Sequence, residues 1–131
     1  MQPRKPQYKT KEVTDSKGFV QTMYQIGDNL YTKDMVDRHR KYTTRNLLRY
    51  ATSLNENPNN NRLTKKFQRE YNMLMELSGD SSRIKVDSKL GEETRQAVRN
   101  VRKIKDELSS DAVFNRLLRL DEKRNLIMGF E

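Results

Sequence analysis

The residue types that most often carry catalytic or metal chemistry are scarce in this sequence. There is no cysteine, which excludes disulfides and thiolate catalysis, and there is no tryptophan. The single histidine, His39, lies between Arg38 and Arg40 in a predicted helix. A zinc site would need carboxylates in an unusual arrangement, and a Ser–His–Asp triad would depend on this one histidine. We therefore interpret His39 as a surface residue.

Long apolar stretches are also missing. Hydrophobic residues make up 33% of the chain and charged residues 34%, and no apolar run approaches the length of a membrane span. The basic residues 1–6 are not followed by the apolar run of a secretory signal. We expect a protein that is made in the cytoplasm without a signal peptide and has a thin helical core.

Acid–base and phosphate-binding motifs are not evident. No glycine-rich phosphate loop exists, since the sequence has only five glycines and none falls in such a pattern. Glu92 and Glu93 are adjacent and suit a helix start, and Glu70 and Glu76 have no apolar pocket predicted around them. The sequence favours a protein that is not an enzyme and has no cofactor or metal.

The charge balance points to an acidic partner. The formal net charge is +9, which favours nucleic acid, an anionic wall or membrane polymer, or an acidic protein surface. The basic residues are interleaved with Asp and Glu along the chain, which weakens the interpretation of a dedicated nucleic-acid binder.

Residues 1–18 contain two of the three prolines and almost no apolar residues, which predicts a basic flexible arm. It is either a frayed tail or an arm that orders against a partner through its basic residues, Arg4, Lys5, Lys9, Lys11 and Lys17. Residues 19–131 are predicted to form one helical domain. At its start, residues 18–31 contain a Gly27-Asp28-Asn29 turn signal, and they suit either two short extended pieces or an apolar strap over the helices.

Helical periodicity dominates the rest of the chain and predicts a mainly α fold, a small helical bundle. The predicted helices cover about 33–54, 62–77 and 92–108, with a last helix after the capping residues Ser109, Ser110 and Asp111. Residues 55–61, rich in Asn, form the loop that ends the first helix, and residues 83–86 are a possible short extended piece. The apolar C-terminal end, Leu126, Ile127, Met128 and Phe130, is expected to dock on the protein's own core or on a partner.

Two rows of arginine run along predicted helices. In the first helix they lie opposite the apolar face formed by Val36, Leu47, Ala51 and Leu54, and in the third they lie on its outer side. These rows are either solvated faces or contact surfaces for an anionic partner: Arg38, Arg45 and Arg49 in the first, and Arg95, Arg99 and Arg102 in the third. Tyr42 and Tyr50 are interpreted as core-edge residues, with phosphate contact as the alternative.

Residues 86–98 are the most distinctive stretch of the sequence. Asp87 and Ser88 are turn formers, Gly91 is expected to adopt a backbone conformation that other residues resist, and Glu92 follows at the start of a helix. Five residues match, at the same spacing, the Asp-Gly-x-Phe-Gly-x-x-Thr-x-x-Ala-Val signature of peptidoglycan-binding-like domains: Asp87, Gly91, Thr94, Ala97 and Val98. Upstream, Phe67-Gln68-x-x-Tyr71-x-x-Leu74 is similar to the family's Leu-Gln-x-x-Leu-x-x-Leu.

The resemblance covers residues 62–104 and departs from the family at three places. Ser88 replaces the turn glycine, Leu90 replaces the phenylalanine, and Val101-Arg102 replaces the closing Phe-Gln. The resemblance implies a three-helix binding module without catalysis.

In the family such modules usually accompany a hydrolase domain, and none is present in this sequence. The context therefore favours a structural or interaction protein of a bacteriophage virion or its assembly, whose partners are other proteins of that assembly. The alternatives are a basic protein that contacts nucleic-acid phosphates and a genuine peptidoglycan-binding module.

Overall fold

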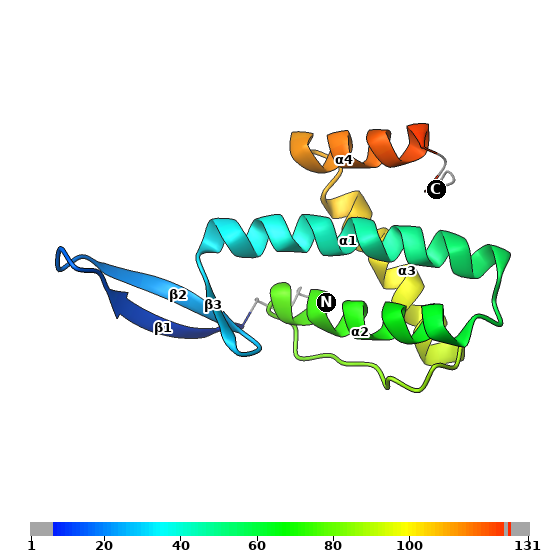
Figure 1. Cartoon of the computed structure of the whole chain (residues 1–131), viewed down its shortest axis with the longest axis horizontal. Helices are drawn as coiled ribbons and strands as arrows, with labels where there is room; N and C mark the ends of the chain where they lie inside the picture. Colours follow the sequence, from blue (N-terminus) through cyan, green and yellow to red (C-terminus); the bar gives the residue numbers. More distant parts are fainter. Residues whose placement is uncertain (1–6, 125, 127–131) are drawn as a thin grey trace, which may run out of the picture.

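The computed structural model describes residues 7–124 and Leu126, which form a small three-stranded sheet and four helices. The protein is thus mainly helical, as the sequence predicts. Helix α1 (Lys33–Glu56) is the long central element, with α2 (Asn61–Leu77) and α4 (Ala112–Lys123) on different sides of it and α3 (Glu92–Glu107) crossing it (Figure 1). None of the helices in this part of the chain is both long enough and apolar enough to cross a membrane.

The sheet extends from the end of the molecule at which α1 begins (Figure 1). Strands β1 (Lys9–Thr14), β2 (Val20–Ile26) and β3 (Asn29–Tyr31) are antiparallel in the order β1-β2-β3. Gly27, at φ 59°, closes the turn between β2 and β3. The two extended pieces expected around the Gly27-Asp28-Asn29 turn are therefore confirmed.

The prediction of a flexible arm over residues 1–18 is wrong for residues 9–14, which form β1. All six side chains of β1 are exposed, and Val13 is its one apolar residue. The strand therefore has no alternation of apolar and polar residues from which it could be predicted. It is held instead by main-chain pairing with β2, from Lys9 opposite Gln25 to Thr14 opposite Val20. Of the remaining basic residues of the predicted arm, Lys17 lies in the turn after β1, and Arg4 and Lys5 lie outside the described residues.

The base of the sheet is fixed to the end of α2. Ile26, Val36 and Leu77 form a small buried cluster, against which Tyr8 and two further tyrosines pack. The Tyr8 hydroxyl donates to the Leu77 carbonyl at 3.1 Å. The Gly27 amide also donates to the Glu76 carboxylate at 2.9 Å. The residue before β1 and the turn between β2 and β3 are therefore both hydrogen-bonded to α2.

Three of the four helices begin at a side-chain cap. Thr32, Asn60 and Asp111 accept hydrogen bonds from main-chain amides three residues further on, at 3.2, 3.1 and 2.9 Å. Helix α3 has no side-chain cap, and the carboxylates of Glu92 and Glu93 lie in its first turn instead. Asp111 is one of the predicted capping residues, and the helix bounds agree with the predicted ones to within one or two residues.

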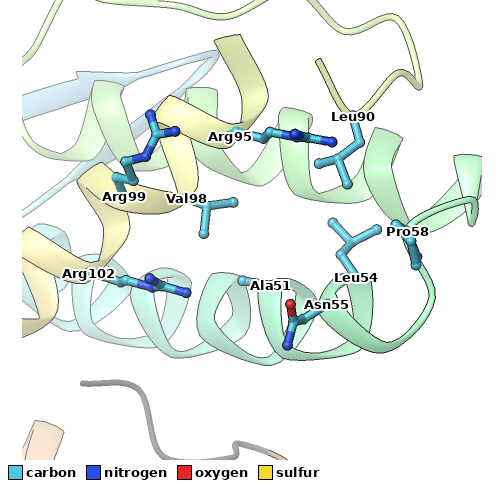
Figure 2. Close-up of a pocket in the computed structure, with 9 residues that line it drawn as sticks. All are labelled: Ala51, Leu54, Asn55, Pro58, Leu90, Arg95, Val98, Arg99 and Arg102. Atoms are coloured by element: carbon cyan, nitrogen blue, oxygen red, sulfur yellow. The ribbon is translucent and has the colours of Figure 1, made fainter. Parts of the chain in front are cut away.

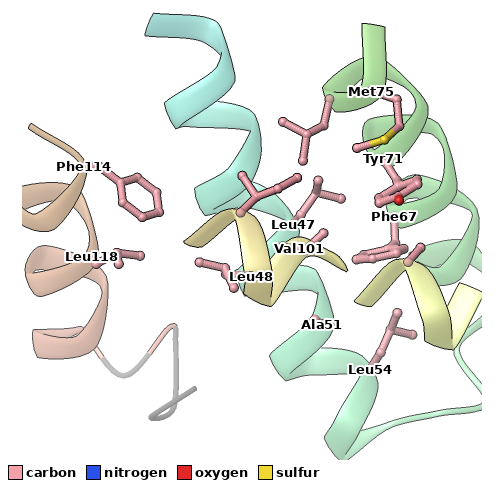
Figure 3. Close-up of a cluster of buried hydrophobic side chains, with 13 residues drawn as sticks. Leu47, Leu48, Ala51, Leu54, Phe67, Tyr71, Met75, Val101, Phe114 and Leu118 are labelled. Carbon is pink, nitrogen blue, oxygen red and sulfur yellow. The ribbon is translucent and has the colours of Figure 1, made fainter. Parts of the chain in front are cut away.

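The main core lies where α2, α3 and α4 meet α1 (Figure 3). Its buried residues come from all four helices: Leu47, Leu48, Ala51, Leu54, Phe67, Tyr71, Leu74, Met75, Ala97, Val101, Ile104, Phe114 and Leu118. The apolar face predicted for the first helix is confirmed, because Leu47, Ala51 and Leu54 belong to this cluster and Val36 belongs to the smaller one. In α4, Phe114 and Leu118 are buried, and Val113 and Leu120 are exposed.

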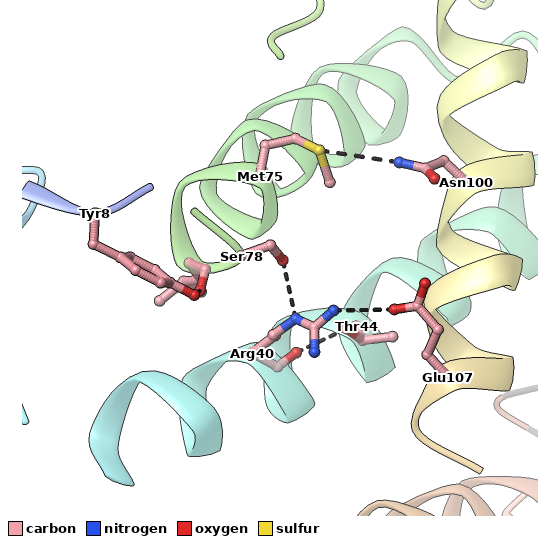
Figure 4. A network of polar contacts seen from close by, with 8 residues as sticks. Tyr8, Arg40, Thr44, Met75, Ser78, Asn100 and Glu107 are labelled. Carbon is pink, nitrogen blue, oxygen red and sulfur yellow. Dashed lines mark hydrogen bonds and ion pairs between the residues drawn. The ribbon is translucent and has the colours of Figure 1, made fainter. Parts of the chain in front are cut away.

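A polar side chain connects three of the helices at the sheet end of the bundle. Arg40 of α1 donates from Nε to the Ser78 hydroxyl at 3.0 Å and pairs through Nη2 with Glu107 of α3 at 3.4 Å (Figure 4). Its carbonyl accepts from the Thr44 hydroxyl at 2.8 Å. Arg40 therefore joins α1 to the end of α2 and to the end of α3.

The connection between α2 and α3 contains no strand, so residues 83–86, the possible short extended piece, do not pair in a sheet. Asn72 holds this segment in place of strand pairing. Its amide donates to the Ile84 carbonyl at 2.9 Å and accepts from the Ile84 amide at 2.8 Å. The range of the family resemblance, residues 62–104, contains α2 and most of α3, and their third helical neighbour is α1, which precedes that range.

The predicted apolar C-terminal end mostly lies outside the described residues. Ile127, Met128 and Phe130 are not described, and Leu126 is exposed. The amide of Leu126 donates to the Asp121 carbonyl at 2.9 Å, which continues the chain from the end of α4.

Candidate functional site

Gln68 is the centre of a hydrogen-bonded network that joins α2 to the turn before α3. Its side chain is fully buried, and its amide nitrogen donates to Asp87 Oδ1 at 2.9 Å, the Lys89 carbonyl at 3.1 Å and Thr94 Oγ1 at 2.9 Å. Its amide oxygen accepts from the main-chain amides of Asp87 and Ser88 at 3.0 and 2.9 Å. Three residues of the sequence signature, Gln68, Asp87 and Thr94, are thus brought together.

The same network fixes the charge of Asp87. Its carboxylate accepts from the Lys89 amide at 2.9 Å and from Gln68, and these bonds hold the pKa of the Asp87 carboxyl below its usual value. Thr94 Oγ1 in turn donates to the Lys89 carbonyl at 3.3 Å. The Asp87 carboxylate is therefore an ionised hydrogen-bond acceptor that holds the turn.

The unusual backbone conformation falls at Ser88, not at Gly91. Ser88 has a φ of 64°, in the left-handed region that favours glycine. Gly91 has φ −91° and ψ −173°, an extended conformation open to other residues, and a Cβ there would meet nothing within 4 Å. The expectation for Gly91 is wrong, and the residue that departs from the signature, Ser88, occupies the strained position.

The remaining signature residues belong to the core. Phe67 and Ala97 are buried in the main cluster, and Val98 packs against it half-buried. Phe67 stacks on Tyr71 with ring centroids 6.2 Å apart, and the Tyr71 hydroxyl accepts from the Asn100 amide at 2.7 Å. Burial raises the pKa of the Tyr71 hydroxyl, so this residue is a neutral hydrogen-bonding group in the core.

The first predicted arginine row does not form one outward-facing surface. Arg49 makes a two-bond ion pair with Asp121 of α4, at 2.6 Å from Nη2 and 3.0 Å from Nε, and Arg45 lies 3.7 Å from the same carboxylate. Asp121 is only 1% exposed. Arg45 and Arg49 therefore face α4 and are only partly exposed, and Arg38 is the one exposed residue of this row.

The sequence does contain a signal for Asp121 that periodicity alone leaves ambiguous. Asp121 follows Phe114 and Leu118 at helical spacing, so it lies on the buried stripe of α4. A carboxylate on such a stripe requires a cationic partner, because an unpaired buried charge is costly. What the sequence cannot supply is that α4 packs on the arginine side of α1.

The second predicted arginine row lies along a groove between α1 and α3 (Figure 2). Arg95, Arg99 and Arg102 project from α3, and all three are exposed. The groove has a volume of about 370 Å³, and its other lining residues are mostly apolar: Ala51, Leu54, Asn55, Pro58, Leu90 and Val98. Arg99 donates to Glu92 at 3.2 Å and to Gln96 at 2.6 Å, contacts that keep its guanidinium close to α3.

The groove was not evident from the sequence, because its floor combines residues of separate elements. Ala51 and Leu54 come from the last turns of α1, and Leu90 comes from the turn before α3. Leu90 stands where the family signature has phenylalanine, so one departure from the signature helps to shape this surface.

Other candidate residues are placed in structural settings. His39 is exposed and packs edge-on against Tyr31, with ring centroids 5.1 Å apart. Tyr50 packs against the core, as the core-edge interpretation expects. Tyr42 is exposed, and the Arg45 guanidinium carbon lies over it, 5.3 Å from the centroid of the Tyr42 ring. Within residues 7–124 and at Leu126, no three His, Cys, Asp or Glu side chains come together as metal ligands would.

Comparison of the chain with protein-family models, with curated proteins and with solved structures gives no significant match.

Proposed function

We propose that this protein is a non-enzymatic structural and interaction protein, a component of a bacteriophage particle or of its assembly, built on a degenerate peptidoglycan-binding-like core. The observation that carries the proposal is the groove between α1 and α3. It is concave, and its lining combines apolar residues with Arg95, Arg99 and Arg102. A surface of this kind suits a partner that is apolar at its centre and acidic at its edge.

The groove side chains suit recognition rather than bond-making chemistry. The nine lining residues are aliphatic residues, a proline, an asparagine and arginines, and none of them is a carboxylate, a histidine or a hydroxyl. Arginine is well suited to this role, because its planar guanidinium binds carboxylates with two parallel hydrogen bonds. The partner we expect is therefore another protein of the assembly that presents acidic side chains.

A second candidate function is peptidoglycan binding. The observation that favours it is the network around Gln68, in which the residues shared with the family signature hold the turn that leads into α3. Val98, another shared residue, lines the groove. Peptidoglycan also carries carboxylates, which the arginine row would attract.

Contact with nucleic-acid phosphates has less support than the sequence suggested. Arg45 and Arg49 are committed to Asp121, so a phosphate-binding surface would depend on the groove arginines and on Arg38. Such a contact would weaken steeply as the salt concentration rises.

The three functions are separated by one set of experiments on matched variants. Peptides of the chain should be found by mass spectrometry in gradient-purified particles of the phage that encodes it, and their absence would overturn the proposal. Retention on purified peptidoglycan sacculi, or salt-sensitive binding to a DNA duplex, would favour the alternatives. The double variant Arg95→Glu, Arg99→Glu should lose the binding that occurs. The double variant Lys65→Glu, Lys66→Glu changes two exposed residues of α2 outside the groove and is its charge-matched control.

A further inference from the structure

The tip of the β1–β2 hairpin is an apolar knob that no part of the described chain covers. Phe19 is 69% exposed and Val20 is 62% exposed, and both lie where the β1–β2 turn leads into β2. This turn is at the end of the ribbon farthest from the helices (Figure 1). Phe19 and Val13 share one face of the ribbon as diagonal neighbours, because Val13 pairs with Gln21 two residues beyond Phe19. Exposed aromatic and aliphatic side chains gathered at a projecting tip are typical of a docking element.

The knob has a fixed shape although it projects into solvent. Asp15 closes the turn by accepting the amides of Lys17 and Phe19 on Oδ1, at 2.8 and 2.9 Å. The Asp15 amide also donates to the Phe19 carbonyl at 2.9 Å, and Gly18 adopts the left-handed φ of 85° that the turn requires. A turn with this many internal bonds presents Phe19 in a preorganised position, which lowers the entropic cost of docking.

The charge of the tip makes phosphate an unsuitable partner. The tip is close to neutral, because residues 12–20 contain Glu12, Asp15 and Lys17, and Lys11 lies next to Glu12. Such a surface has no excess of positive charge with which to bind phosphate, while its two carboxylates can pair with cationic side chains. The acceptor we seek is therefore apolar inside and basic at its edge.

The groove between α1 and α3 has these properties, and it lies at the other end of the same molecule. Its floor includes Leu54 and Val98, and Arg95 lies at its edge (Figure 2). Helix α1 separates the two features: its 24 residues span about 36 Å, with the sheet at its start and the groove at its end. The ribbon points away from the helices, so a hairpin cannot reach the groove of its own chain (Figure 1).

We propose that the hairpin tip of one copy of this chain docks into the α1–α3 groove of the next copy. Phe19 enters the apolar floor, and the acidic side chains of the tip face the arginine row. The contact joins two different surfaces and is head-to-tail, so it continues from copy to copy into a ring or a filament. The inference rests on the proposed function in one respect, that the groove is a protein-docking surface.

The size of the contact sets the conditions of the test. A single hairpin tip buries much less than the roughly 1,200 Å² of a stable protein interface, so one contact is weak and many copies reinforce one another. Sedimentation velocity should show an average mass that rises with concentration between about 10 µM and 1 mM, the range of weak contacts. A protein that stays monomeric throughout this range, or a wild type that stops at a dimer, overturns the proposal.

Variants of exposed residues test the two surfaces without disturbing the core. Phe19→Ser and Arg95→Glu should each weaken association at least about tenfold, as truncation of a central interface residue does. Lys17→Glu should strengthen association, because it makes the tip more acidic, while Lys9→Glu at the base of the hairpin should leave it unchanged. If Phe19→Ser associates as the wild type does, the knob is not the docking element and the proposal fails.

A mixing experiment distinguishes a head-to-tail contact from a two-fold one. Phe19→Ser keeps an intact groove and Arg95→Glu keeps an intact tip, while each alone associates at least about tenfold more weakly than the wild type. Their equimolar mixture should form a one-to-one dimer that grows no further, since only one productive contact can form. A mixture that remains monomeric refutes the docking arrangement.

The outcome is separable from that of the proposed function. A monomeric protein found in purified particles removes self-docking and leaves the proposed function in place. A chain that associates through these surfaces but is absent from particles removes the proposed function instead.

Discussion

Replacing Gln68 by methionine is the most direct test of how the turn before α3 is held. Methionine keeps the length of the side chain and its apolar stem, and it removes the amide that is buried at this position. The five hydrogen-bond contacts of that amide reach Asp87, Ser88, Lys89 and Thr94. We expect the variant to fold with the same helices and with a markedly lower free energy of unfolding.

The size of the loss in the free energy of unfolding depends on which of these partners can bond to water instead. Each contact contributes about 0.5–1.5 kcal/mol net, so five would sum to roughly 2.5–7.5 kcal/mol. Asp87 and Lys89 are exposed and can bond to solvent in the variant, whereas Thr94 is buried and loses its donor outright. We therefore expect the lower part of the range, a loss of about 2–4 kcal/mol in the free energy of unfolding.

Urea denaturation followed by circular dichroism at the helical band measures this loss. With a slope of about 1–3 kcal/mol per molar urea, the midpoint should fall by about 1–2 M. The control is Gln96→Met on α3, where the side chain is exposed and its oxygen accepts one bond from Arg99, so its midpoint should hardly move. A Gln68→Met variant within about 1 kcal/mol of the wild type would refute the reasoning.

Three further changes test other features of the fold. Ser88→Gly should raise the free energy of unfolding by up to about 1 kcal/mol, because glycine relieves the left-handed φ of 64°, and the thermal midpoint measures it. Asp121→Asn should lower the free energy of unfolding by about 2–3 kcal/mol in urea, less than for a fully buried pair because the Arg49 side chain is 30% exposed. The hydrogen-bonded ion pair with Lys41, at 2.8 Å, lowers the pKa of Asp111 below its unfolded value, so its stabilisation is present above about pH 4 and is lost as the pH falls through the folded pKa. The urea midpoint of the wild type should therefore drop on acidification below about pH 4, and that of Asp111→Asn, which keeps a capping side chain, should drop less.

Neighbouring residues provide the controls for these changes. Ser82→Gly lies in the same connection without a left-handed φ, and it should not stabilise the protein. Glu122→Gln removes an exposed carboxylate next to Asp121 and should change the free energy of unfolding little. Stabilisation by Ser82→Gly, or an equal loss from Glu122→Gln, would show that the two explanations are wrong. An equal acid response in the wild type and Asp111→Asn would show that the ion pair with Lys41 does not set the pH dependence.

The helices were predictable because each carries its own signals. The apolar spacing of Phe67, Tyr71 and Leu74 defines the buried face of α2, and the predicted capping residue Asp111 marks the start of α4. These signals are local, since a helix makes its hydrogen bonds within one segment. The positions of Gln68, Asp87 and Thr94 in one network also agree with the idea that the distinctive stretch builds the turn into α3.

What the sequence by itself determined is therefore the helices, their inner faces and the importance of the stretch before α3. The tertiary structure alone decided the rest, because it depends on segments that are distant in sequence. β1 exists through pairing with β2 and has no apolar pattern of its own. Arg49 turned from a predicted contact residue into half of an ion pair because Asp121, 72 residues later, packs against it. The groove likewise forms only where the end of α1 meets α3. A local sequence pattern cannot predict a surface to which two distant segments contribute.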